Sequence, residues 1–217
     1  NKIYILQVRR LNVKKNSKIN FKKSLKDLEK KILKMKDETT HLIGKKRYYS
    51  NMTDWNPAEI VGLKPKPLAI SLYESLITDE IWAESRKDLG YNDTTKIPLL
   101  YSFLGTPYID LRTDINSFLV PELPKKTQEK LINFYFNQFE KNPYKLYDKI
   151  ESSLVINCIS LDINKYKKLL SESGLSKKEK DEIISKYTNL TSKIVLKLND
   201  NIKRYEHGKY LLNKQLK

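Results

Sequence analysis

Two short segments place polar side chains among apolar ones, which is the pattern of a small-molecule binding site. The first spans residues 54–59 and contains Asp54, Asn56 and Glu59 beside a tryptophan and a proline. Carboxylates can accept protons or bind an ammonium group, and a side-chain amide can read another amide through paired donor and acceptor contacts. Asn56 before Pro57 is also a typical helix start, so a structural cap is the competing interpretation.

The second segment runs from Tyr108 to Arg112 and is followed by Asn116 and Ser117. If residues 108–112 form a strand, Tyr108, Asp110 and Arg112 alternate onto one face and line a common surface. The alternative is that Asp110 and Arg112 form an ion pair that ties the strand to a loop. Spacing alone favours neither interpretation.

Several catalytic classes are excluded by what the sequence lacks. It contains no P-loop, no dinucleotide-binding glycine motif, no Gly-x-Ser-x-Gly elbow and no zinc-ligand cluster, so we predict no metal site. With 6 glycines, one cysteine and two histidines, the chain offers few nucleophile–base pairs. His41 and His207 both fit boundary or surface positions.

The elements that position these residues are mostly helices. Apolar spacing and start signals predict helices over residues 17–38, 67–77 and 127–140, one that begins at Pro57, one capped by Thr78 or Asp79 and ending near residue 87, and a long one after a Ser176/Glu179 capping box. Strands are expected over residues 3–11, 97–103, 108–112 and 154–161, with a turn at Gly105-Thr106-Pro107. We therefore expect an α+β fold that is mostly helical, with a few short strands and long helices at both ends.

The net charge and the cysteine content bear on the cellular compartment and on one alternative function. Lys+Arg 42 against Asp+Glu 26 gives a net charge of +16, and much of it lies in runs such as Lys45-Lys46-Arg47 that we interpret as solvated faces. A single cysteine, Cys158, in an apolar stretch and the lack of a long apolar run predict a cytoplasmic protein without a membrane partner. The charge leaves open a basic module that binds nucleic acid or protein, although no RNA-binding aromatic motif supports it.

Residues 3–9, Ile-Tyr-Ile-Leu-Gln-Val-Arg, resemble the closing strand of the ATP-grasp domain in the phosphoenolpyruvate synthase and pyruvate phosphate dikinase superfamily. The resemblance implies that Gln7 and Arg9 help to hold nucleotide phosphates and metal. Arg10 stands where the family usually has proline. The chain begins at Asn1 and runs at once into this stretch, so we expect it to be an internal piece of a longer enzyme.

A longer resemblance covers roughly residues 47–160. Residues 54–62 (DWNPAEIVG), 67–73 (PLAISLY), 105–112 (GTPYIDLR) and 116–118 (NSF) are similar to the central region of dikinase-like enzymes from surface-polysaccharide gene clusters. This group includes L-glutamine kinases that supply phosphoramidate for capsule modification. Residues 147–151 also resemble a family segment, with Tyr147 standing where we expect histidine.

The resemblance implies a three-part kinase. An ATP-grasp domain uses ATP and Mg²⁺ to phosphorylate a histidine on a mobile domain, which then delivers the phosphoryl group to an acceptor on the central domain. We assign residues 1–12 to the edge of the ATP-grasp domain, 13–44 to a connector helix and 45–217 to the acceptor-binding domain. This chain lacks the family's histidine motif and is not expected to be active alone.

An amino-acid acceptor would need a clamp, a base and amide-reading groups. We expect Arg112 to bind a carboxylate or the phosphoryl group and Asp54 to serve as its catalytic partner. Asn56, Glu59, Tyr108, Asp110, Asn116 and Ser117 are the expected substrate-binding residues. L-Glutamine is the favoured acceptor, and pyruvate or another small metabolite is the alternative within the same machinery.

Overall fold

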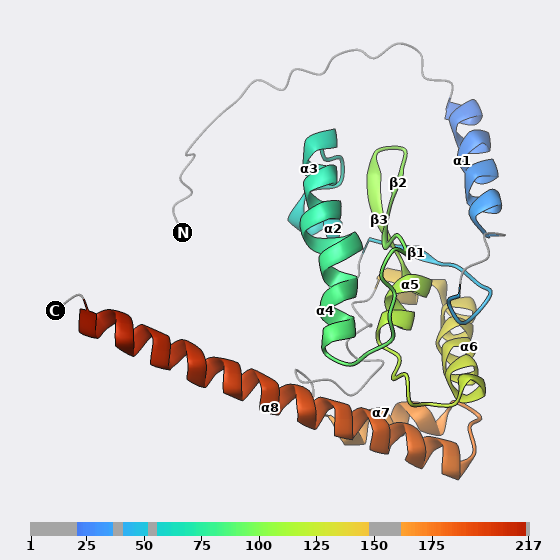
Figure 1. Cartoon of the computed structure of the whole chain (residues 1–217). Coiled ribbons are helices and arrows are strands. Elements are labelled where there is room, and N and C mark those ends of the chain that lie inside the picture. The colour runs from blue at the N-terminus through green and yellow to red at the C-terminus, as the bar shows by residue number, and fades with distance from the viewer. Residues whose placement is uncertain (1–20, 37–40, 52–55, 148–161, 216–217) are drawn as a thin grey trace, which may run out of the picture. The chain divides into compact units, whose positions relative to one another are not determined.

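The computed structural model describes residues 21–36, 41–51, 56–147 and 162–215 (Figure 1). The chain divides into two compact units after Asp37. The first unit contains the helix α1 (Phe21–Lys36), which lies within the range expected for the connector helix. Residues 41–44, which we assigned to that connector, belong to the second unit.

The second unit is α+β and mostly helical, as expected. Its elements are β1 (Tyr49–Ser50), α2 (Pro57–Ile60), α3 (Pro67–Tyr73), η1 (Glu74–Trp82), α4 (Ala83–Asp88), β2 (Leu100–Phe103), β3 (Thr106–Asp110), α5 (Leu111–Ser117), α6 (Lys125–Lys141), η2 (Pro143–Tyr147), α7 (Ile163–Ser171) and α8 (Lys177–Gln215). The strands expected over residues 3–11 and 154–161 lie outside the described residues.

The three strands form an antiparallel sheet in the order β1-β3-β2. Phe103 pairs with Thr106, so the β2–β3 hairpin turns on two residues, Leu104 and Gly105, both with positive φ (52° and 80°). This conformation suits the right-handed twist of a hairpin and favours glycine at the second position. The turn therefore lies one residue earlier than the sequence predicted.

The sequence predicted one strand over residues 108–112, and this prediction is wrong at its end. Strand β3 ends at Asp110, and the Asp110 side chain accepts a hydrogen bond from the Arg112 amide, 2.8 Å away, to start α5. An aspartate at this position satisfies a free helix N–H group, and that local bond ends the strand. Tyr108 and Asp110 share a sheet face, whereas Arg112 reaches the same region from a helix.

Residues 67–88 form one continuous helical segment, in which the π-helix η1 joins α3 to α4. The separate helix that we expected to be capped by Thr78 or Asp79 is not formed. Asp79 instead accepts hydrogen bonds from the amides of Leu99 and Leu100, each at 3.0 Å. This segment lies along one face of the sheet (Figure 1). Tyr73 packs there with Leu100 and Ile109.

The main core lies among helices α5 to α8. Leu131, Ile132 and Phe136 of α6 are fully buried against residues of α5, α7 and α8. Buried tyrosine hydroxyls find partners there: the Tyr135 and Tyr166 oxygens lie 3.2 Å apart, and Tyr187 donates to the Phe118 carbonyl at 2.8 Å. This packing holds α5, and with it Arg112, in place.

Helix α8 begins with the predicted capping box. Ser176 and Glu179 exchange hydrogen bonds of 2.9 and 3.3 Å, which confirms the start read from the sequence. The apolar stripe of α8 is buried at Ile183, Tyr187 and Ile194. The same stripe is exposed at Leu198, Ile202 and Tyr205.

Candidate functional site

The two faces of the sheet differ in chemistry. On one face, Leu100 and Ile109 pack beneath the long helical segment, and the other side chains that the pairing places on this face are Ser50, Ser102 and Pro107. The opposite face carries aromatic side chains and one carboxylate, because Tyr49 pairs with Asp110, Tyr101 with Tyr108, and Phe103 with Thr106. The Tyr49 ring lies 5.4 Å from that of Tyr101 and 4.9 Å from that of Phe103.

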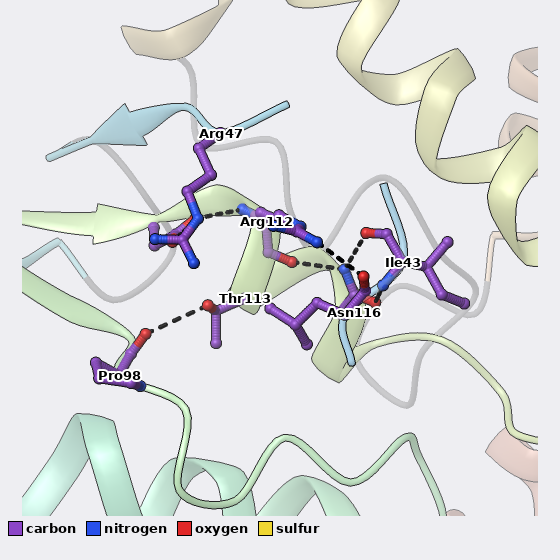
Figure 2. Close-up of polar contacts among 8 residues, drawn as sticks. Ile43, Arg47, Pro98, Arg112, Thr113 and Asn116 are labelled. Carbon is purple, nitrogen blue, oxygen red and sulfur yellow. Dashed lines mark hydrogen bonds and ion pairs between the residues drawn. The ribbon is translucent and has the colours of Figure 1, made fainter. Parts of the chain in front are cut away.

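Asp110 lies at the end of this aromatic face and is completely buried. One carboxylate oxygen accepts the Arg112 amide, and the other lies 3.7 Å from Nε of Arg47, whose side chain is 3% exposed (Figure 2). Burial raises the pKa of the Asp110 carboxyl to about 6, although Arg47 and the amides of Arg112 and Thr113 favour its charged form.

Arg112 supplies a second guanidinium to this buried cluster and is 6% exposed. Its Nη2 donates to the Leu42 carbonyl at 2.8 Å, whereas its buried Nε has no hydrogen-bond acceptor among the described residues. Burial, together with the charge of Arg47, lowers the pKa of the Arg112 guanidinium. The cluster of Arg47, Asp110 and Arg112 thus contains two guanidinium groups and one carboxylate, although only the Arg47 guanidinium lies beside that carboxylate, and its charges sum to an excess of positive charge.

Asn116 and Ser117, both expected to bind substrate, are buried in α5 and make structural hydrogen bonds. Asn116 accepts from the Ile43 amide at 2.9 Å and donates to the carbonyls of Ile43 and Arg112 at 3.0 and 2.8 Å (Figure 2). The Ser117 hydroxyl donates to the Asp114 carbonyl at 2.6 Å. Asn116 therefore fixes the segment that also accepts the Arg112 side chain.

The first polar segment is only partly described. Asn56 caps α2 by accepting from the Ala58 amide at 2.9 Å, as the capping interpretation predicted, and Glu59 is exposed on the same short helix. Asp54 lies outside the described residues, as do Gln7 and Arg9, the expected nucleotide contacts.

The structure brings Tyr108, Asp110 and Arg112 together and adds residues that sequence reasoning missed. Arg47 was interpreted as part of a solvated basic run, but its side chain is buried beside Asp110. Tyr49 and Tyr101 complete the aromatic face. Burial, followed by the Asp110 charge, raises the pKa of Tyr49 to about 12. The alternation of Arg47 with Tyr49 was the signal available in the sequence.

Within the described ranges, no group of three or more His, Cys, Asp or Glu side chains is placed to hold a metal ion. No helix in that part of the chain is long and apolar enough to cross a membrane. Comparisons with protein families, with curated proteins and with solved structures find no match to this chain.

Proposed function

We propose that this chain is the acceptor-binding domain of an ATP-dependent phosphotransferase and that L-glutamine is its acceptor. The observation that carries the proposal is the buried cluster of Arg47, Asp110 and Arg112, in which Nε of Arg112 has no hydrogen-bond acceptor among the described residues. An unpaired, desolvated guanidinium N–H favours an incoming carboxylate or phosphoryl oxygen, because that anion replaces a lost hydrogen bond and offsets the excess charge.

The resemblance over residues 47–160 supplies the reaction class. In the proposed reaction, the bond between the phosphoryl group and a histidine nitrogen breaks, and a bond to the acceptor's amide nitrogen forms. The proton released by that nitrogen moves to a carboxylate, for which Asp54 is our candidate. ATP and Mg²⁺ act in a separate nucleotide-binding domain that recharges the histidine, and both further domains belong to the same polypeptide in this proposal.

We assign different roles to the residues of this cluster. Arg112 clamps the anionic group, and Asp110 positions that clamp by accepting its backbone amide and by facing Arg47. Tyr108 shares the sheet face with Asp110 and is half-buried, so its hydroxyl can reach a ligand. Asn116 acts indirectly, since it fixes the segment that holds Nη2 of Arg112.

Calorimetric titration of this chain with L-glutamine tests the proposal. Arg112→Lys keeps the positive charge but removes the planar guanidinium with its paired N–H donors, so we expect L-glutamine binding to weaken about tenfold or more. Tyr108→Phe should weaken binding without unfolding the domain. Arg204→Lys, on the exposed part of α8, is the matched control and should bind as the wild type does.

Two outcomes would overturn the proposal. One is the absence of L-glutamine binding by the folded chain, and the other is equal loss in the Arg112→Lys and Arg204→Lys variants. Preferential binding of pyruvate would replace the acceptor and keep the reaction class. In the intact enzyme, Arg112→Ala should abolish transfer to the acceptor and leave histidine phosphorylation unchanged; loss of both half-reactions would contradict the role of Arg112.

A further inference from the structure

A hollow of about 630 Å³ lies along α6, and its lining includes none of Arg47, Asp110 and Arg112, the residues of the sheet cluster. Its other wall is the turn between α7 and α8, which includes Ser173 and Gly174. Lys130 of α6 and Glu179 of α8, 2.6 Å apart, join the two walls at one end. The volume falls within the range of about 300–1,000 Å³ that is typical of small-ligand sites.

Helical spacing gives this hollow a row of polar side chains. Asn133, Asn137 and Lys141 follow one another at intervals of four residues, so they lie above one another on one face of α6. None of the three side chains makes a hydrogen bond or ion pair with the described residues, and all three are exposed. The row therefore offers a ligand the donors and acceptors of two side-chain amides and the donors of one ammonium group.

The neighbouring side chains restrict what the hollow can bind. Lys145 donates to Oε1 of the Gln138 side-chain amide at 2.6 Å, which leaves the side-chain N–H groups of Gln138 for a ligand. Phe134 contributes an apolar surface to the lining. Because Glu179 pairs with Lys130, the remaining charged groups of the lining are Lys141, Lys145 and Glu172, and this excess of one positive charge favours an anion.

We propose that this hollow is a binding site for a phosphorylated polyol, such as a sugar phosphate. Lys141 binds the phosphate as a mobile point charge. Asn133 and Asn137 bind hydroxyl groups, because an amide both donates to and accepts from a hydroxyl. The spacing of one helical turn between them, about 5–6 Å between Cβ atoms, suits two hydroxyls on opposite sides of a sugar ring rather than adjacent ones.

Glucose 6-phosphate is the probe, titrated into the isotope-labelled chain while side-chain amide signals are followed by NMR. We expect saturable shifts of the Asn133 and Asn137 amides, with weaker binding of glucose and of inorganic phosphate. Lys141→Ala and Asn137→Ala should each weaken binding about tenfold. The matched controls Lys168→Ala and Asn164→Ala, exposed on α7, should leave affinity and thermal stability unchanged.

Equal loss in the Lys141→Ala and Lys168→Ala variants would overturn the site, because it would reveal only the general attraction of a basic surface. Inorganic phosphate binding as tightly as glucose 6-phosphate would overturn the polyol assignment. Absence of any amide shift at millimolar probe would overturn both. Arg112→Lys should leave this binding unchanged, so its outcome is independent of the acceptor experiment.

Discussion

Asn116 provides the sharpest test of how the sheet cluster is held together. Its side chain makes three hydrogen bonds, two to Ile43 across 73 residues of sequence and one to the Arg112 carbonyl in its own helix. Asn116→Ala removes all three hydrogen bonds and leaves the Ile43 amide and the carbonyls of Ile43 and Arg112 without this partner. We therefore expect the segment around Ile43 to loosen and the acceptor for Nη2 of Arg112, the Leu42 carbonyl, to be displaced.

The magnitude follows from the number of bonds. At about 1 kcal/mol each, three hydrogen bonds give a loss of about 3 kcal/mol in the free energy of unfolding. For a domain of this size, that loss corresponds to a fall in melting temperature of about 6–12 °C. Urea unfolding followed by circular dichroism measures the free energy, and a thermal scan measures the melting temperature.

Two further variants make the test specific. Asn116→Asp keeps an acceptor for the Ile43 amide but loses both donors, so we expect it to be at least as destabilising as the alanine variant. Asn164→Ala, exposed on α7, is the control and should change the free energy by less than about 0.5 kcal/mol. A loss below about 1 kcal/mol in Asn116→Ala, or wild-type stability in Asn116→Asp, would refute the stabilising role of the Asn116 hydrogen bonds.

Three other perturbations address the cluster and its frame. The pKa of Asp110 is about 6 in the folded state against an ordinary 3.8, so the folded chain binds the extra proton and its stability falls as pH rises between these values. Asp110→Asn should remove that fall, which unfolding measured across this pH range will show; an unchanged slope would contradict burial as the cause. Ser176→Ala breaks the capping box with Glu179 and should cost about 1 kcal/mol by urea unfolding. Gly44 has a φ of +86°, and a Cβ added there would lie 2.8 Å from a core side chain, whereas Gly105 has a φ of +80° and open space around it. Gly44→Ala should therefore lower the melting temperature more than Gly105→Ala does. Equal losses in melting temperature would refute the close approach at Gly44.

The sequence by itself determined the features that depend on neighbouring residues. The Asn56 cap, the Pro67 helix start, the helix containing Leu131 and the Ser176 capping box all follow from contacts within a few positions. Such contacts depend on residue type and spacing alone. The same kind of reasoning predicted a mostly helical α+β fold, and the structure confirms it.

Tertiary structure decided which polar residues meet. Asp79 accepts the amides of Leu99 and Leu100 instead of capping a helix, because the chain returns to it 20 residues later. Arg47 is buried although it follows two lysines, since β1 pairs with β3 and places it beside Asp110. The burial of a charge depends on segments far apart in the sequence, and no local pattern records which of them will pack together.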